Sequence, residues 1–158
     1  MAGHPPRKRR IVEDRRYPCR PWVAVGVVVW QSERVLLIRR GRPPGLGEWG
    51  LPGGAQKAGE TLFETAIREV WEETGLAIQP QAVLTAVDGL THDAQGQVLY
   101  HYTLVEIHAL CPAGEPEAAD DALAAGWFTL AEAEARLAWS ETLRIIRLSA
   151  EMAGISPA

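Results

Sequence analysis

The sequence predicts an α/β fold in which helices cover a mixed β-sheet. Runs rich in β-branched residues lie on both sides of one amphipathic helical segment, and the chain ends in further helical patterns. With 158 residues, the chain is long enough for a single domain that buries roughly 70% of its unfolded surface. We therefore expect an α/β sandwich built around one central sheet.

The first predicted elements form a hairpin. Residues 22–30, WVAVGVVVW, are typical of a buried strand, and a turn at 31–34 leads to a partner strand at 35–38. Residues 41–54 then contain six glycines and three prolines, so we expect a long loop with a short extended piece at 49–51. A glycine-rich loop placed directly before a helix is well positioned to shape a functional site.

The predicted central helix covers residues 61–74. Thr61 and Glu64 fit a capping box at its start, and Gly75 suits a left-handed residue at its end. We expect one side of this helix to bury against the core, namely Phe63, Ala66, Ile67 and Val70.

The second half of the chain alternates strands, a loop and helices. Two strands are predicted at 82–87 and 98–110, on either side of a turn at 93–96. An acidic, alanine-rich loop at 112–125 leads to a short strand and two helices, predicted at 126–130, 131–137 and 141–152.

The central helix carries a dense group of carboxylates. At about 100° per residue, Glu69, Glu72 and Glu73 fall within roughly 100° of one another on one face. Like charges at these spacings cost a helix on the order of 0.2–0.5 kcal/mol per pair, so helix stability gives no reason for them. Hard oxygen ligands suit Mg²⁺, with Mn²⁺ as the alternative, whereas the lack of nearby Cys or His argues against zinc.

The same stretch resembles the Nudix box. Residues 54–76 read GAQKAGETLFETAIREVWEETGL, and every fixed position of that motif is filled, including Gly54, Glu60 and Gly75. The chain is therefore similar to Nudix hydrolases over residues 22–137. The resemblance implies a Nudix-type α/β/α sandwich around a mixed β-sheet, and we expect one such domain over residues 21–158.

A basic arm precedes this domain. Residues 1–20 hold seven Arg or Lys against two acids, so the net charge of −4 conceals a remainder that carries −9. The run at 7–10, RKRR, has two interpretations: a flexible, solvated arm, or an arm that attracts polyphosphate or nucleic acid or reaches a second subunit.

Composition suggests a cytoplasmic protein. The longest apolar run, residues 22–30, is too short to span a membrane, and the N-terminus lacks the apolar stretch of a secretory signal. We expect a small-molecule nucleotide as the partner rather than a membrane or nucleic acid. A homodimer is an option that rests on the family resemblance alone.

The resemblance also implies which residues bind the cation. A diphosphate link carries negative charge that must be neutralised before water can attack phosphorus, and divalent cations meet this need. The implied ligands are the helix carboxylates and a backbone carbonyl of the opening glycines: Glu69, Glu72, Glu73 and either Gly53 or Gly54. Arg68 is expected to pair with Glu60 or another carboxylate and so orient the ligands.

The general base is left open by the family pattern. Some members use a glutamate of the box, here Glu72 or Glu73, and others use an acid from a distant loop, here within residues 115–121. Within that loop we favour Asp121, and an ordinary exposed loop acid is the alternative interpretation.

Substrate contacts are predicted on three elements. Arg40 and Arg42, with neighbouring Arg39, follow the second strand and can meet phosphates. Trp49 can stack on a base, as can Tyr100 or Tyr102, although packing is the alternative for all three.

The family splits nucleoside diphosphates linked to another moiety. The pattern GEWGLPGG at 47–54 resembles ADP-ribose pyrophosphatases, so ADP-ribose is the favoured substrate. A nucleoside triphosphate, including an oxidised one, is the second hypothesis. A non-catalytic Nudix domain that binds a nucleotide or RNA is the third.

Overall fold

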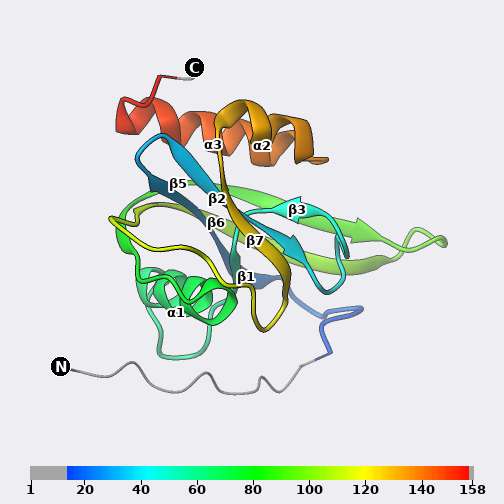
Figure 1. Ribbon diagram of the computed structural model, residues 1–158. Coiled ribbons are helices and arrows are strands. Elements are labelled where there is room, and N and C mark those ends of the chain that lie inside the picture. The colour runs from blue at the N-terminus through cyan, green and yellow to red at the C-terminus, as the bar shows by residue number, and fades with distance from the viewer. Residues whose placement is uncertain (1–13, 157–158) are drawn as a thin grey trace.

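A seven-stranded mixed sheet forms the centre of the computed structural model, which describes residues 14–156. The strands are β1 (Trp22–Gln31), β2 (Arg34–Arg40), β3 (Trp49–Gly50), β4 (Gly53–Ala55), β5 (Gln79–His92), β6 (Val98–Leu110) and β7 (Ala122–Phe128). The helices are α1 (Leu62–Thr74), α2 (Leu130–Arg136) and α3 (Ser140–Ala153). Helix α1 covers one face of the sheet, whereas α2 and α3 lie together over the other (Figure 1).

Strand β1 is the organising strand of the sheet. The main order is β3-β2-β1-β6-β5, with β4 paired to β1 and β7 paired to β2. Strands β1 and β6 run parallel, and all other pairs are antiparallel, so the sheet is mixed as predicted. Strand β2 pairs with β1 only near Trp30, which leaves the edge of β1 at residues 24–26 to pair with β4.

The side chains of β1 alternate between two cores. Val25, Val27 and Val29 pack with α1, whereas Val28 and Trp30 pack with α3. Because successive strand residues point to opposite faces, a continuous apolar run can fill both layers. This division confirms the predicted α/β/α sandwich.

Three strands differ from the prediction. Strand β5 covers 79–92 rather than 82–87, and β7 begins at 122 rather than 126. Strand β4, at Gly53–Ala55, was predicted as loop, because glycines have low strand propensity. It forms because β1 offers an open row of backbone hydrogen-bonding groups at its N-terminal half.

The ends of α1 are as predicted. The Thr61 hydroxyl accepts a hydrogen bond from the Glu64 amide at 3.1 Å, and the Glu64 carboxylate accepts one from the Thr61 amide at 2.7 Å. Gly75 adopts the left-handed conformation with φ 71°. The capping box and the glycine stop are therefore confirmed.

The buried face of α1 corrects the predicted one. Ala66 and Val70 are fully buried as expected, but Phe63 and Ile67 are 37% and 43% exposed. Glu69 and Glu73 are buried in their place, at 0% and 2% exposure. The stripe facing the sheet thus follows the spacing 66, 69, 70 and 73, which places carboxylates rather than apolar groups beneath β4.

Part of the basic arm lies against the domain. The Tyr17 amide donates to the Leu99 carbonyl at 2.9 Å, and the Tyr17 hydroxyl donates to the Asp93 carboxylate at 3.0 Å. Residues 14–20 therefore contact the β5–β6 hairpin. The RKRR run at 7–10 lies outside the described residues. Within residues 14–156, no helix is long and apolar enough to cross a membrane.

Strand β6 buries two polar side chains toward α3. The His108 Nδ1 atom lies 2.6 Å from the Ser149 hydroxyl, which also accepts a hydrogen bond from the Trp30 indole at 2.9 Å. Glu106 is 3% exposed, and its Oε2 atom has no hydrogen-bond partner among residues 14–156. Burial raises the pKa of Glu106 to about 7.

This burial predicts a pH-dependent stability. Because the pKa of Glu106 is higher in the folded state than in the unfolded state, its stabilising contribution is present below about pH 4.5 and is lost as pH rises through about 7. Between about pH 5 and pH 8, the wild type should lose on the order of 2–3 kcal/mol of unfolding free energy relative to Glu106→Gln. Urea denaturation of both proteins at the two pH values measures this difference, and identical pH profiles would contradict it.

Candidate active site

Arg68 is the centre of the acidic cluster on α1. Its Nη1 atom lies 2.7 Å from Glu69 Oε1 and 3.2 Å from Glu72 Oε2. Its Nε and Nη2 atoms donate to the two carboxylate oxygens of Glu60, and Nη2 also donates to the Ala55 carbonyl at 3.0 Å. One planar guanidinium thus joins the loop before the helix, the helix itself and β4. The pairing of Arg68 with Glu60 is present as predicted.

Glu60 is held as a charged partner of Arg68. The hydrogen bond from Arg68 lowers the pKa of Glu60 to about 2, with smaller contributions from the Lys57 amide and the Thr65 hydroxyl. The Glu60 carboxylate contacts the Lys57 amide, the Thr65 hydroxyl and Arg68, and Glu60 is not among the residues that line the cavity described below. Glu60 therefore positions Arg68 rather than facing the cavity.

Glu69 and Glu73 lie beneath the glycines of β4. A Cβ atom at Gly54 would lie 2.5 Å from the Glu69 carboxyl carbon, so only glycine allows this approach. The Gly53 amide donates to Glu73 Oε2 at 3.0 Å. Burial, together with the Glu69 charge, raises the pKa of Glu73 well above its ordinary value, although the Gly53 amide opposes this shift.

The three helix carboxylates do not meet at one point. Within residues 14–156, no three acidic, His or Cys side chains are arranged closely enough to hold a metal ion together. Glu69 and Glu72 turn toward Arg68, whereas Glu73 turns toward Gly53. The expected convergence of Glu69, Glu72 and Glu73 on one cation is therefore not seen among the described side chains, where each carboxylate binds a protein donor, and it stays a prediction.

The donor set nevertheless fits a hard divalent cation. Glu69 and Glu73 are buried side by side, and their mutual repulsion contributes to the raised pKa of Glu73. The nearby ligands are carboxylate and backbone oxygens, which Mg²⁺ and Mn²⁺ prefer.

The acidic loop brings Asp121 to the end of α1. The Ala119 amide donates to the Glu73 carbonyl at 2.9 Å, which docks the loop on the helix. The Asp121 carbonyl accepts a hydrogen bond from the Gly41 amide at 2.7 Å, and its carboxylate lies 2.8 Å from Arg42 Nε. Asp121 is close enough to Glu73 for its charge to raise the pKa of Glu73.

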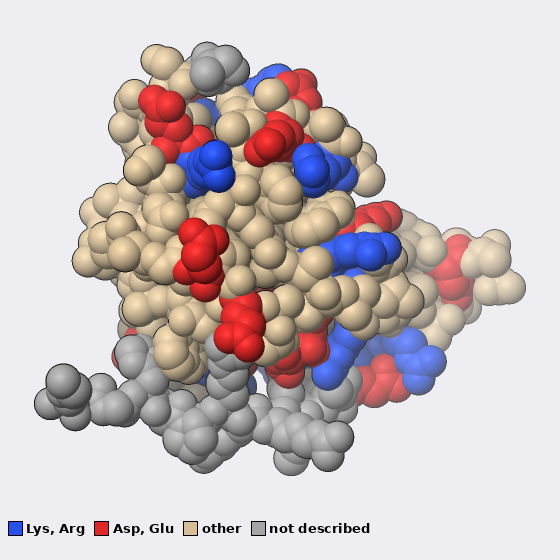
Figure 2. Space-filling view, viewed as in Figure 1, with Lys and Arg blue, Asp and Glu red and all other residues tan. Residues whose placement is uncertain are grey.

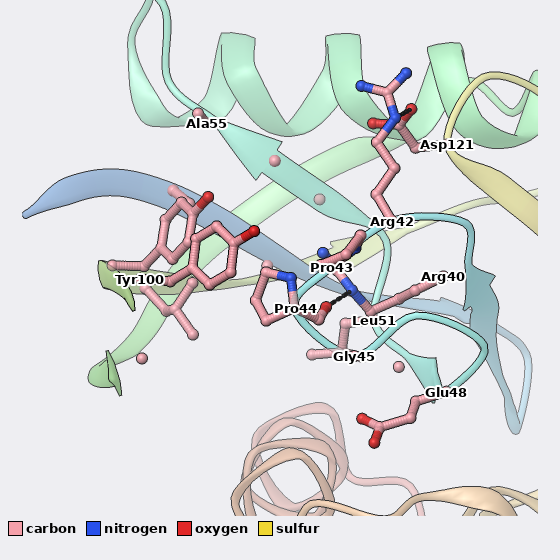
Figure 3. A pocket seen from close by; sticks show the side chains of 18 of the residues that line it. Arg40, Arg42, Pro43, Pro44, Gly45, Glu48, Leu51, Ala55, Tyr100 and Asp121 are labelled. Carbon is pink, nitrogen blue, oxygen red and sulfur yellow. Dashed lines mark hydrogen bonds and ion pairs between the residues drawn. The ribbon is translucent and has the colours of Figure 1, made fainter. Parts of the chain in front are cut away.

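A large cavity opens between this acidic end and α3. Its volume is about 1010 Å³, which is large enough for a dinucleotide-sized ligand. Figure 3 shows Tyr100 on one side, the Pro43–Pro44 turn in the middle, and the Arg42–Asp121 pair beside α1. The sequence-predicted residues that line this cavity are Arg40, Arg42, Trp49, Gly53, Gly54, Glu73, Tyr100, Tyr102 and Asp121.

The predicted substrate-binding residues have structural contacts as well. Arg40 donates from Nε to the Pro44 carbonyl at 2.8 Å, and Arg42 pairs with Asp121 (Figure 3). The Trp49 ring packs edge to face on Phe128, with centroids 5.2 Å apart. Both arginines retain donor atoms beyond these contacts, since a guanidinium has five N–H groups.

Glu106 was missed by sequence reasoning. It lines the same cavity from β6, although it is nearly fully buried. The available signal was an acid between Val105 and Ile107 in an otherwise apolar stretch of a predicted strand. Trp139 and Thr142, at the start of α3, also line the cavity and carried no recognisable pattern.

The charges on the face shown in Figure 2 are mixed. Lys and Arg side chains lie beside Asp and Glu, and no broad basic surface gathers over the described elements in this view. The RKRR run at 7–10, which suggested binding of nucleic acid, lies outside the described residues.

Comparisons with known proteins agree with the site. Residues 20–148 match the family model described as NUDIX domain. The chain is 33% identical over 123 residues to the ADP-ribose pyrophosphatase of Methanocaldococcus jannaschii, covering 78% of this chain and 70% of that protein. It is 37% identical over 84 residues to human 8-oxo-dGDP phosphatase NUDT18, covering 53% of this chain and 24% of that protein.

Solved structures show the same fold. A MutT NUDIX hydrolase from Burkholderia pseudomallei superposes with a TM-score of 0.69 at 31% identity, covering 82% of this chain and 98% of that one. The NUDIX domain of Shewanella oneidensis NrtR, solved with ADP ribose, gives a TM-score of 0.68 at 25% identity, covering 85% and 89%. The family model, the sandwich fold and the acidic helix agree, and the chain therefore belongs to the NUDIX family and is a Nudix hydrolase.

Proposed function

We propose that this enzyme is a Mg²⁺-dependent pyrophosphohydrolase of nucleoside diphosphates linked to another moiety, with ADP-ribose as the favoured substrate. One observation carries the proposal: Glu73, which is buried next to Glu69 on α1, lines a large cavity together with arginines and tyrosines. The acidic end suits a cation with phosphates, and the aromatic end suits a nucleoside.

The carboxylates of α1 and β4 carbonyls are the proposed ligands of the cation. Glu69, Glu72 and Glu73 supply carboxylate oxygens, and Gly53 or Gly54 supplies a carbonyl. When bound there, Mg²⁺ or Mn²⁺ neutralises phosphate charge and lowers the pKa of water. Arg68 keeps Glu69 and Glu72 close to each other despite their repulsion.

The remaining residues of the cavity orient substrate and accept a proton. Arg40 and Arg42 lie at the rim near α1, where they can bind phosphate oxygens. Asp121 and Glu73 both line this part of the cavity, and burial together with the Glu69 charge raises the pKa of Glu73. We favour Asp121 as the general base, with Glu73 as the alternative.

Two relatives support ADP-ribose as the substrate. The archaeal relative is named an ADP-ribose pyrophosphatase, and the NrtR domain was solved with ADP ribose. An oxidised nucleotide is the second candidate, because the human relative is named an 8-oxo-dGDP phosphatase.

A substrate panel tests the proposed function. With Mg²⁺, purified enzyme should convert ADP-ribose to AMP and ribose 5-phosphate faster than it hydrolyses diadenosine polyphosphates, NADH, deoxynucleoside triphosphates or 8-oxo-dGDP. Chromatography of the products measures each rate, and EDTA should abolish the reaction, because the phosphate charge is then not neutralised. Faster turnover of 8-oxo-dGDP would favour the second candidate, and turnover of none would overturn the proposal.

Paired variants identify the general base. Asp121→Asn should lower kcat on the order of 10²-fold, because the proton acceptor is lost. Glu73→Gln should lower kcat and also weaken Mn²⁺ binding, measured by calorimetry, since Glu73 is a proposed ligand. Glu33→Gln, in the exposed β1–β2 turn, is the charge-matched control. Unchanged turnover in Asp121→Asn would exclude Asp121 as the base.

Replacement of Arg68 tests its positioning role. Arg68→Lys keeps the charge but cannot contact Glu60, Glu69 and Glu72 at once, because an ammonium lacks the planar fork. We expect Mn²⁺ affinity and kcat/KM to fall by about 10–100-fold while the enzyme remains folded. Calorimetry and circular dichroism measure both effects. Wild-type affinity in Arg68→Lys would show that charge alone is sufficient.

A further inference from the structure

Glu106 lies where the open cavity meets the closed core. Along β6, every second residue points to the α3 side of the sheet. Tyr100, Tyr102 and Leu104 are partly exposed and line the cavity, whereas Glu106 and His108 are buried. Because Glu106 is both buried and part of the lining, it is a polar group on the floor of the cavity.

The backbone is shaped to admit this carboxyl group. Gly26 of β1 pairs with Glu106 across the parallel ladder, and a Cβ atom at Gly26 would overlap Glu106 Oε2. An alanine would therefore displace the carboxyl group. Gly26 thus has a steric reason to be glycine inside an otherwise β-branched strand.

The fold itself gains nothing from this carboxyl group. His108, two residues further along β6, bonds to Ser149, but Glu106 Oε2 has no hydrogen-bond partner within residues 14–156. Buried polar groups without partners destabilise a protein, and their occurrence calls for an explanation. A hydrogen-bond donor on the bound substrate would explain why this buried carboxyl group is present.

Glu106 lies on the opposite side of the sheet from the carboxylates of α1. It faces α3, as His108 does, although Glu106 and Glu73 line the same cavity. A phosphate is a poor partner for this group, because no cation among the described residues pairs with Glu106 to hold an anion there. The lining near Glu106 includes Leu51, Tyr102 and Leu104, which suit a flat heterocycle better than a sugar.

We propose that Glu106 is a specificity-determining residue that accepts a hydrogen bond from the exocyclic amino group of an adenine base. This assignment rests on the proposed function, since it places a nucleotide in this cavity. Adenine presents its amino donor beside a ring-nitrogen acceptor. Burial raises the pKa of Glu106 to about 7, so about half of the carboxyl groups are protonated at neutral pH, and the protonated form can accept from the amino group while donating to the ring nitrogen.

Binding of AMP and purine riboside 5′-monophosphate tests the proposal without hydrolysis. Purine riboside 5′-monophosphate has a hydrogen in place of the amino group and keeps the ring-nitrogen acceptor, so its contact with Glu106 lacks the amino donor. Calorimetry without divalent cation should give the wild type a Kd for AMP about 10–100-fold lower than for this analogue. Glu106→Leu should bind both with similar Kd, and Glu33→Gln should behave as the wild type. A preference for AMP that persists in Glu106→Leu, or that is missing in the wild type, would overturn the proposal.

Glu106→Gln and thermal stability separate recognition from a structural role. Glutamine offers an acceptor and a donor, so the preference for AMP should return to within about 3-fold of wild type. Equal loss of the preference in Gln and Leu would contradict the proposed pair of hydrogen bonds, because glutamine still offers both an acceptor and a donor. Both variants should melt at or above the wild-type temperature, because an unpartnered carboxyl group is removed. Lower melting temperatures in both would show that Glu106 supports the fold and would overturn the proposal.

The outcomes also separate this inference from the proposed function. If the wild type prefers AMP over purine riboside 5′-monophosphate through Glu106 but does not hydrolyse ADP-ribose, the proposed function fails and the role of Glu106 stands. If it hydrolyses ADP-ribose without that preference, the role of Glu106 fails alone.

Discussion

The contacts of one guanidinium hold this site together. Arg68 binds Glu60 in the turn before α1, Glu69 and Glu72 on the helix, and the Ala55 carbonyl at the end of β4. Carboxylates this close would repel one another strongly in a buried site, where few water molecules screen them. Because Arg68 neutralises part of this charge, the helix can turn acidic side chains toward the sheet. The acidic residues of the motif and Arg68 therefore also hold the preceding turn, α1 and β4 together.

Glycines determine how closely the layers approach. Gly54 leaves room for the Glu69 carboxyl group on one face of the sheet, and Gly26 leaves room for Glu106 on the other. Strand β4 reaches this position because β2 pairs with only the far end of β1. The acidic cluster and the nucleotide-sized cavity thus come from the two sides of the same short stretch of sheet. This arrangement connects the proposed site for cation and phosphate with the proposed site for a nucleoside.

Local patterns predicted much of the fold and part of the site. The capping box, the Gly75 stop and the strand at 98–110 followed from residues near one another in sequence, and so did the acidic helix. The predicted buried face of α1 was wrong at Phe63 and Ile67, because periodicity gives two opposite faces and does not say which one meets the sheet. Strand β4 could not be predicted, since its formation depends on an edge of β1 rather than on its own residues.

The sequence by itself determined the family, the α/β class and the set of carboxylates, because these depend on spacing along one helix. Only the tertiary structure decided which carboxylate faces which donor: Glu72 and Glu69 face Arg68, Glu73 faces Gly53, and Asp121 faces Arg42. It also placed Glu106 on the cavity floor, although nothing near it in sequence marks it as functional. The reason is physical: burial and pairing depend on which chain segments meet in space, and those segments are far apart along the chain.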